Sequence, residues 1–548
     1  MPFAFGPAFF NGRPVNVARA VTPSAATADI ERDPDLIARY LEDAAHYPGG
    51  HAMAIARPHD IAEAAAAVRQ ASRLLPVGAQ SSLTGGATPS GDLVLSTERL
   101  SAIRRVSDRV IAGAGVTLHE LQESLAADRV WLPPVPTYLG ATVGGAVSTN
   151  AAGAATFKYG PMRPWVQALT VVLSCGDVLH VTRGEVIASD EGDFVVQTSA
   201  GDCTIRVPDV RMPDVPKRSA GYHSAPHMDL VDLFIGAEGT LGVVVEAELR
   251  IQPRPAGMCW VMIPLTSESA AIALTADLRD AAIETWRSRD PRGIDLSAIE
   301  HIDRRSLEVV REDGVDRRLG ITLPHATDVV LLAQVELSPT FASRDLWRDL
   351  ENAIAEDSED TPLARLCQML DRHGALQDTE VALPADTRRA AAFVELREAV
   401  PAGVNRRVSL ARAVDARISK TAADMIVPYA SFDRMMHACR EMCAAANLDI
   451  AVWGHISDGN VHPNVIPRSY EDVERGRQML VELARLVIEM GGCPLAEHGV
   501  GRNPVKQALL RMLYGESGIE AMRRVKLSLD PSWKLAPGVL FPPPNTTT

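Results

Sequence analysis

The sequence predicts an α+β protein built from several domains. At 548 residues, the chain is long enough for two or three domains that each bury a core. Between residues 45 and 256, glycine-rich tracts alternate with helical and β-branched stretches, which is typical of loops that close on one extended ligand. From residue 258 to 430, amphipathic helices alternate with short strands, which indicates an α+β cap rather than a second nucleotide fold. We therefore expect a leader (1–44), a ligand-binding domain (45–256), a cap domain (257–480) and a C-terminal helical segment (481–548).

Composition and charge argue against several classes of protein. Hydrophobic residues make up 46% of the chain and charged residues 23%, which is ordinary for a soluble globular protein. The formal net charge of −14 argues against a nucleic-acid binder and disfavours tight docking to anionic lipid. No apolar run reaches the ~18–20 residues of a transmembrane helix, and the N-terminus lacks a signal-peptide pattern. We therefore expect a cytoplasmic protein, with peripheral attachment to the inner membrane as an alternative.

Cysteine usage fits a reducing compartment. The seven cysteines are odd in number and scattered without a CxxC pair, so a disulfide framework is not expected. Cys439 and Cys443 stand one helical turn apart, and we interpret them as core packing.

The first domain opens with a strand and a helix, followed by the first glycine tract. The alternation over His51–Arg57 predicts a strand, and Asp60 is a suitable N-cap for an alanine-rich helix that runs to about Leu75. The tract Pro76–Leu100 then carries four glycines interleaved with Ser and Thr. Such a loop presents several backbone N–H groups in one direction and suits a pyrophosphate, although it is neither a Rossmann nor a Walker A sequence.

Two further small-residue tracts follow in the same domain. Gly140–Gly153 leads into a predicted strand at Val166–Leu173, which ends at a turn. Asp232–Glu246 contains GAEGTLG and opens another β-branched strand. The proline-rich stretch Ile251–Gly257 is interpreted as a linker.

The rest of the chain is predicted to alternate strands and helices. Strands are predicted at Cys259–Pro264 and Asp328–Val335, and helices at Phe341–Ala355, Thr387–Ala399, Glu471–Met490 and Pro504–Tyr514.

The segment Ile450–His462 (IAVWGHISDGNVH) predicts a β-hairpin with chemistry on one face. Asp458-Gly459 is the dipeptide that best indicates a two-residue type I′ turn. With that turn, His455 lies directly opposite His462, at a separation that lets two imidazoles share one metal ion.

A later segment, AEHGVG, would complete such a site. Spacing alone leaves open whether Glu497 or His498 supplies the third ligand. The alternative to a catalytic site is a structural metal site with four protein ligands, in which the histidine pair only stabilises the hairpin.

Several motifs together resemble one flavoprotein family. PVGAQSSLTGGA, ATVGGAVSTNAAG, KYG and IGAEGTLGVV are similar in kind and order to the FAD-binding domain of the vanillyl-alcohol oxidase/p-cresol methylhydroxylase (PCMH) superfamily. LREAVPAGVN, GHISDGNVHPN, AEHGVG and LDPSWKLAPG resemble its FAD-linked D-2-hydroxyacid dehydrogenase branch, which includes D-lactate, D-2-hydroxyglutarate and glycolate dehydrogenases. The resemblance covers residues 45 to 541.

The resemblance implies a two-subdomain PCMH-type FAD-binding domain, an α+β (ferredoxin-like) substrate cap and a C-terminal segment that returns to the flavin. The first glycine loop has no His or Cys, so the FAD is expected to be non-covalent. Carried over to this sequence, the residues expected at the cofactor are Pro76, Gly78, Ala79, Gln80, Ser81, Ser82, Gly85, Gly86, Gly140, Thr142, Gly144, Gly145, Thr149, Asn150, Gly153, Tyr159, Gly160, Glu238, Gly239, Gly242 and Val243.

The resemblance also implies a metal site and catalytic residues. A divalent metal, zinc or manganese, would fall on His455, His462 and Glu497. The active-site base would fall on His498 and a substrate-facing amide on Asn464, which shares the face of His462 two residues away.

Arg397 matches the arginine that holds the substrate carboxylate in that branch. Lys420 lies two residues early for the substrate-binding lysine of D-2-hydroxyglutarate dehydrogenases, so that role is not carried over.

The expected activity is oxidation of a D-2-hydroxy acid to the 2-oxo acid by hydride transfer to flavin N5. The expected electron acceptor is a quinone, a cytochrome or an electron-transferring flavoprotein. A homodimer is one possible oligomeric state. No nucleic-acid partner is expected. The alternatives are a 2-hydroxyacid oxidase that uses oxygen and a non-redox flavoprotein with a structural metal site.

Overall fold

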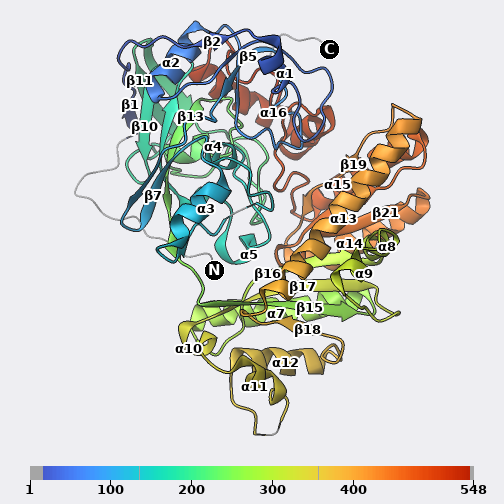
Figure 1. Ribbon diagram of the computed structural model, residues 1–548. Helices are drawn as coiled ribbons and strands as arrows, with labels where there is room; N and C mark the ends of the chain where they lie inside the picture. Colours follow the sequence, from blue (N-terminus) through green and yellow to red (C-terminus); the bar gives the residue numbers. More distant parts are fainter. Residues whose placement is uncertain (1–15, 135, 356, 544–548) are drawn as a thin grey trace.

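The computed structural model describes residues 16–134, 136–355 and 357–543. Figure 1 shows two bodies, one above the other. The upper one contains the first domain together with the C-terminal helix, and the lower one is built around the cap sheet.

The first domain begins with a small mixed sheet. Its order is β2-β3-β5-β4, and β3, β5 and β4 run parallel. The strands and the helix between β3 and β4 are β2 (Ile30–Glu31), β3 (His51–Ala56), α2 (Ile61–Gln70), β4 (Leu74–Val77) and β5 (Ser90–Ser96). Asp60 caps α2 as predicted, because its Oδ1 accepts the N–H of Glu63 at 2.9 Å. The predicted helix end at Leu75 is wrong, since Leu74 and Leu75 already pair with β5.

A five-stranded antiparallel sheet forms the second part of this domain, in the order β10-β9-β13-β7-β6. The predicted strand at Val166–Leu173 is confirmed as β9. The strands are β6 (Ile103–Val106), β7 (Arg109–Gly113), β9 (Val166–Val172), β10 (Val178–Thr182) and β13 (Val243–Arg250). Around it lie β1 (Val17–Arg19), α1 (Pro34–Ala38), α3 (Leu118–Ala126), β8 (Val130–Trp131), α4 (Val143–Ser148), α5 (Thr156–Tyr159), η1 (Arg163–Trp165), β11 (Asp193–Thr198), β12 (Gly201–Arg206), α6 (Leu230–Phe234) and β14 (Gln252–Pro253).

The cap is organised around an eight-stranded sheet in the order β18-β15-β17-β16-β21-β22-β19, with β20 also pairing to β22. Both strands predicted before residue 340 are confirmed, as β15 and β17. The strands are β15 (Gly257–Leu265), β16 (Asp295–Asp303), β17 (Val329–Leu337), β18 (Glu380–Ala382), β19 (Thr421–Ala422), β20 (Met425–Ile426), β21 (Ile450–His455) and β22 (Asn460–Val465). Alternate residues enter different cores, with Val261 and Ile263 on one face of β15 and Met262 on the other.

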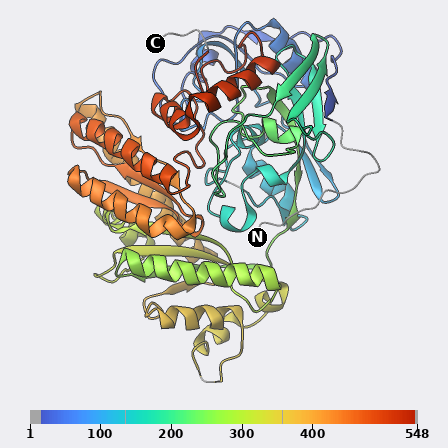
Figure 2. The ribbon, with the colours of Figure 1, turned by 180° about the vertical axis from the view of Figure 1, so that it is seen from behind.

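Helices cover both faces of this sheet. On the face seen in Figure 1 lie α8 (Arg304–Glu312) and α13 (Thr387–Val414), and on the face seen in Figure 2 lie α7 (Glu268–Ser288), α14 (Phe432–Ala445) and α15 (Tyr470–Glu489). Cys439 and Cys443 are buried in α14, which confirms their interpretation as core residues. Shorter helices are α9 (Val315–Leu319), α12 (Pro362–Arg372), η2 (Tyr429–Ser431) and η3 (Ile456–Asp458).

Two helix predictions in the cap need correction. The single helix predicted over Phe341–Ala355 is wrong, because α10 (Pro339–Ala342) stops and Asp345 caps a new helix, α11 (Leu346–Glu351). The helix predicted to end at Ala399 runs on to Val414 through Pro401. Val400 and Val404 are both fully buried, so packing of this face offsets the cost of an internal proline.

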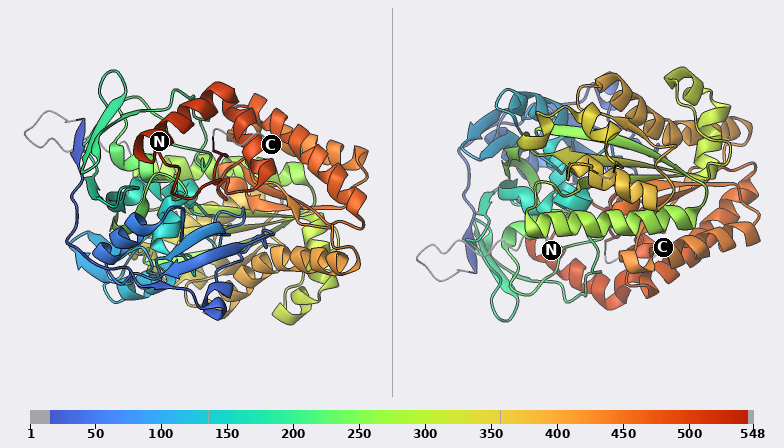
Figure 3. Two further views of the ribbon diagram at one scale, coloured as in Figure 1. Left: turned by 90° about the horizontal axis from the view of Figure 1, so that it is seen from above. Right: turned by 90° about the horizontal axis from the view of Figure 1, so that it is seen from below.

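The chain returns to the first domain after the cap. Helix α16 (Pro504–Leu529), which is kinked at Gly515, lies against that domain in the view from above (Figure 3). Beyond it, Leu74 on the edge strand β4 donates to the carbonyl of Lys534 at 2.9 Å and accepts from Ala536 at 2.7 Å. The segment between α15 and α16 therefore crosses from the cap to the first domain. Within the described residues, none of the helices combines the length and apolar character needed to cross a membrane.

Candidate active site

The hairpin β21–β22 presents both predicted histidines, but in a different register from the one predicted. His455 pairs with Asn460, and Trp453 pairs with His462. The two-residue turn is wrong because Ile456–Asp458 form the 3-10 turn η3, which Gly459 closes with φ +82°. His455 and His462 are therefore diagonal neighbours rather than opposed. A shift of two residues keeps a side chain on the same face, so the imidazole rings still lie 5.5 Å apart.

Glu497 joins the two histidines to form a cluster with metal-site geometry. Its Oε1 lies 3.4 Å from Nε2 of His455 and 3.3 Å from Nε2 of His462. Tetrahedral bonds of ~2.0–2.1 Å place neighbouring ligand atoms ~3.3–3.4 Å apart, so these separations match a four-coordinate ion. Two imidazoles and one carboxylate suit zinc or manganese and leave a position open.

Each histidine of the cluster is backed by a buried carboxylate. Nδ1 of His455 lies 3.0 Å from Oε1 of Glu300, and Nδ1 of His462 lies 3.5 Å from Oδ1 of Asp424. A carboxylate hydrogen-bonded to the outer nitrogen fixes the tautomer and orientation of a metal-binding imidazole, as Glu300 does for His455, whereas Asp424 approaches His462 without a hydrogen bond. Burial lowers the pKa of His455, but Glu300 and Glu497 together outweigh it and raise the pKa to about 9.

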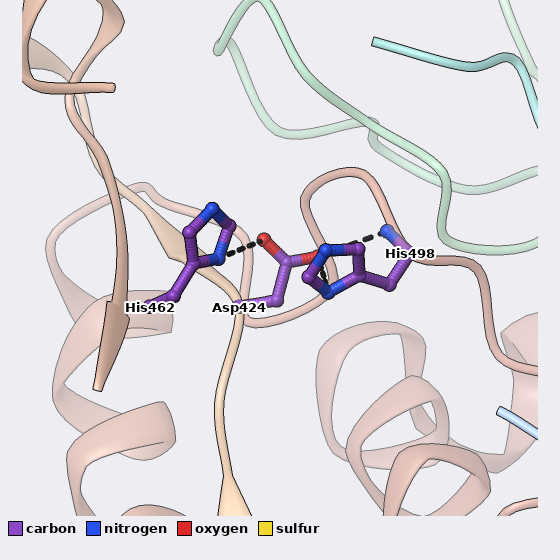
Figure 4. A group of neighbouring side chains, drawn as sticks. All are labelled: Asp424, His462 and His498. Atoms are coloured by element: carbon purple, nitrogen blue, oxygen red, sulfur yellow. Dashed lines mark hydrogen bonds and ion pairs between the residues drawn. The ribbon is translucent and has the colours of Figure 1, made fainter. Parts of the chain in front are cut away.

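Asp424 also connects His462 to His498 (Figure 4). Its carboxylate lies between the two imidazoles, with Oδ2 at 3.4 Å from Nδ1 of His498, and the two rings stack at 5.1 Å. These three side chains could also surround a metal ion. However, Oδ1 of Asp424 already accepts from Asn460, and Oδ2 accepts the N–H groups of Glu497 and His498. We therefore interpret Asp424 as an organiser of the site, and His455, His462 and Glu497 as the set that fits the metal.

Lys217 brings a fully buried positive charge to this cluster from the first domain. Its Nζ lies 2.9 Å from Oε2 of Glu497 and 3.2 Å from Asp458, and donates to Asn460 at 3.1 Å. Burial alone would lower the pKa of the ammonium, but Asp458 and Glu497 raise it above the usual value, so Lys217 stays charged. Burial would likewise raise the pKa of Glu497, yet Lys217 and His455 hold it well below the usual range.

His498 contacts Asp424 and His462 of the cap on one side and lines a cavity on the other. Its side chain keeps 28% of its exposure, and its Nε2 lies 3.6 Å from Oε1 of Glu497. Burial lowers the pKa of His498 to about 4, against the opposing effect of Asp424. The imidazole is therefore neutral at pH 7 and able to accept a proton next to the metal cluster.

Arg397 and Asn464 lie on the cap side of the same centre. The guanidinium of Arg397 donates to Thr137 of the first domain at 3.0 Å and lies 3.4 Å from Glu300, while its Nε is buried without a hydrogen-bond partner. Asn464 donates to the carbonyl of His462 at 2.9 Å, and its Oδ1 is buried without a partner. Both side chains thus hold polar atoms that a ligand would satisfy.

A cavity of about 300 Å³ extends from His498 and Glu497 along the glycine tracts of the first domain. It is walled by all three tracts. The cofactor residues predicted from the sequence that line it are Pro76, Gly78, Ala79, Gln80, Ser81, Ser82, Gly86, Thr142, Gly144, Gly145, Thr149, Glu238, Gly239 and Gly242. Those that do not line it are Gly85, Gly140, Asn150, Gly153, Tyr159, Gly160 and Val243.

Two of the residues outside the cavity wall, Tyr159 and Asn150, have side-chain partners elsewhere in the structure. The hydroxyl of Tyr159 donates to Glu336 of the cap at 2.7 Å, and Oδ1 of Asn150 accepts the N–H of Arg163 at 3.0 Å. Tyr159 thus contributes to the contact between the first domain and the cap.

The cavity wall has the character of a nucleotide cradle. A Cβ on Gly78 would lie 2.2 Å from Oγ1 of Thr142, and one on Gly239, where φ is +72°, would lie 2.6 Å from Pro76. Only glycine fits at these points, where one tract presses against another. These glycines therefore let the tracts pack closely while they line the cavity, and a wall of such small residues fits the pyrophosphate of FAD.

Sequence reasoning missed four buried side chains that support the site, namely Lys217, Ser219, Glu300 and Asp424. None of the four stands in a turn motif or a spacing pattern that indicates a site. The available signal was the charged Asp424 directly before the apolar strand β20, where a buried carboxylate needs partners.

Comparisons with known proteins agree with this arrangement. Residues 266–540 match the family described as FAD linked oxidases, C-terminal domain, and residues 52–182 match an FAD binding domain. The chain is similar to the glycolate oxidase subunit GlcD of Bacillus subtilis, with 27% identity over 85% of this chain and 83% of the relative. It is also 27% identical to a D-lactate dehydrogenase of Archaeoglobus fulgidus over 88% of this chain and 90% of the relative.

The chain is also similar to a further relative and to a solved structure. A D-2-hydroxyglutarate dehydrogenase of Xanthomonas citri is 27% identical over 89% of both chains. Among solved structures, an alkyldihydroxyacetonephosphate synthase shares the fold with a TM-score of 0.56 and 13% identity, covering 93% of this chain and 83% of that one. The PCMH-type fold implied by the family resemblance is thereby confirmed.

Proposed function

This chain belongs to the FAD-linked oxidases, and on that basis we propose that it is a metal-dependent dehydrogenase that oxidises a D-2-hydroxy acid to the 2-oxo acid. The observation that carries the proposal is the position of His498. Its neutral imidazole lines the cofactor cavity on one side and approaches the His455–His462–Glu497 cluster on the other. The names of the D-lactate and D-2-hydroxyglutarate dehydrogenases among the relatives support the substrate class.

The reaction removes a proton from the hydroxyl oxygen and a hydride from C2. When bound, FAD supplies the hydride acceptor and a divalent cation supplies a Lewis acid for the hydroxyl oxygen. His498 takes the hydroxyl proton at Nε2, because Asp424 is placed to hold its Nδ1–H. The products are the 2-oxo acid and a protonated imidazole, with two electrons delivered to the cofactor.

Residues of the cap would select and orient the acid. Arg397 carries a buried Nε without a protein partner, so its guanidinium can bind a substrate carboxylate. Asn464 offers an unpaired Oδ1 on the face of His462 and would accept from a donor on the substrate or on a bound water. Each orients the ligand without taking part in proton transfer.

Turnover with an artificial electron acceptor would test this function. Purified FAD-loaded protein would be assayed with D-lactate, D-2-hydroxyglutarate, their L-forms and glycolate. The assays would be run before and after chelation and after readdition of zinc or manganese. We expect activity with a D-acid and not with its L-form, loss on chelation and recovery on readdition. Activity that survives removal of all metal would refute metal dependence, and peroxide formed in step with turnover would identify an oxidase.

A further inference from the structure

The segment Ala496–Gly501 carries His498, and its backbone N–H groups from Glu497 onwards are bound by side chains rather than by other backbone groups. Five consecutive backbone N–H groups, from Glu497 to Gly501, each donate to a side-chain oxygen from another part of the chain. An irregular buried segment needs a partner for every backbone N–H. Its conformation is therefore set by the side chains that accept those bonds, and not by a helix or a strand.

Three side chains supply these acceptors, one from the cap and two from the first domain. Asp424 of the cap accepts the N–H groups of Glu497 at 2.8 Å and His498 at 3.0 Å. Ser219 accepts from Gly499 at 3.1 Å and its own hydroxyl donates to the carbonyl of Ala496 at 3.2 Å. The segment is thus held from both sides.

Glu238 accepts the last two N–H groups. Its Oε1 accepts from Val500 and its Oε2 from Gly501, both at 2.8 Å. The backbone of Glu238 is itself fixed at φ +49°, and its N–H donates to the carbonyl of Ser148 at the end of α4. A Cβ on Gly499 would lie 3.0 Å from Oε1, so glycine permits this close approach. Both carboxylate oxygens are therefore committed to the segment that carries His498, although Glu238 also lines the cofactor cavity.

We propose that Glu238 is a positioning residue that holds the backbone after His498, so that the imidazole stands between Asp424 and the cofactor cavity. The inference rests on the proposed role of His498 as the proton acceptor. It differs from the prediction that Glu238 binds the cofactor, because its two acceptor atoms face Val500 and Gly501. A displacement of about 1 Å at a reacting group can cost on the order of 10²-fold in rate, so a modest relaxation of this segment would reduce turnover.

Glu238→Gln tests the proposal with little change in shape. The amide keeps one acceptor oxygen and turns an NH₂ group towards a backbone N–H, so one of the two bonds is lost. We expect faster hydrogen–deuterium exchange in peptides that cover residues 496–503, with kcat lower by ~10–100-fold and KM changed by less than about threefold. The amount of FAD bound per protein should equal that of the parent.

Matched variants provide the controls. Glu120→Gln alters a carboxylate that accepts the N–H of Thr117 at 2.9 Å in the capping box of α3, and it should leave exchange at 496–503 and turnover unchanged. Ser219→Ala removes the acceptor of the Gly499 N–H and the donor to the carbonyl of Ala496, and it should raise exchange in the same peptides. It gives a second test of the same segment if Glu238→Gln does not fold.

Three results would separate the alternatives. Parent-like exchange and kcat in Glu238→Gln would overturn the proposal. Loss of FAD with unchanged exchange would also overturn it and assign Glu238 to the cofactor. If the parent protein oxidises no D-2-hydroxy acid, the proposed function fails. The exchange data would still decide whether Glu238 holds the segment.

Discussion

Replacing Lys217 by methionine should destabilise the fold, because it leaves the buried carboxylates of Asp458 and Glu497 without their positive partner. The side chain of Lys217 is completely buried, and those of Asp458 and Glu497 keep only 1% and 9% of their exposure. Methionine preserves much of the apolar stem but removes the ammonium that pairs with two buried carboxylates. Breaking a buried ion pair from one side typically costs ~3–5 kcal/mol, because the remaining charge is left unpaired in a medium of low polarity.

The magnitude is checked by urea unfolding of FAD-loaded protein in the presence of a chelator. Far-UV circular dichroism and intrinsic fluorescence should give coincident transitions before a free energy is extracted. We expect Lys217→Met to lower the free energy of unfolding by ~3–5 kcal/mol. The double variant Lys217→Met/Asp458→Asn should recover part of that loss, because one uncompensated carboxylate is gone. A Lys217→Met protein within ~1 kcal/mol of the parent would refute the reasoning, since that is the range of exposed pairs.

Three further outcomes are expected. His498→Asn should bind FAD normally and lose ~10²–10⁴-fold in turnover, the usual range for a general base, and an unchanged rate would remove His498 from the mechanism. Glu497→Gln should lose bound metal in elemental analysis while it retains FAD, because a neutral amide is a poorer ligand for a divalent cation, and full metal retention would contradict the ligand set. Burial lowers the pKa of His223 to about 3, below its unfolded value near 6.5, so its stabilising contribution is complete above about pH 6.5 and declines as pH falls towards 3. His223→Gln should therefore flatten the fall in the free energy of unfolding over that window by up to ~1.4 kcal/mol per pH unit, as measured by urea unfolding at a series of pH values, and identical pH profiles would show that His223 is not a source of acid sensitivity.

The elements that could be predicted from the sequence are those fixed by local patterns. Asp60 caps α2 because a short polar side chain before an alanine-rich run satisfies a free helix N–H. Short apolar runs marked β15 and β17, and the glycine tracts indicated a cofactor loop once their order was seen to resemble that of a known flavoprotein family. Helix ends were less well predicted, as Pro401 shows, since tertiary packing outweighed the local preference.

The candidate site was predictable only in part. His455, His462, Glu497 and His498 stand in recognisable motifs, and they come together although the predicted turn was wrong. Their supporting residues are different. Lys217 lies 280 positions before Glu497, and nothing in its neighbourhood indicates a buried ammonium. Contacts of that kind depend on how two domains dock, so the pairing becomes visible only in three dimensions.

The measurement that tests the central claim most directly is the visible absorption spectrum of the purified protein, recorded without oxygen. Spectra would be compared before and after addition of D-lactate, then D-2-hydroxyglutarate, with the L-forms as controls. The account predicts an oxidised flavin band that bleaches with a D-acid and is unchanged by its L-form, because hydride transfer reduces the bound FAD. Well-folded protein without a flavin band, or a band that bleaches equally with both enantiomers, would contradict it.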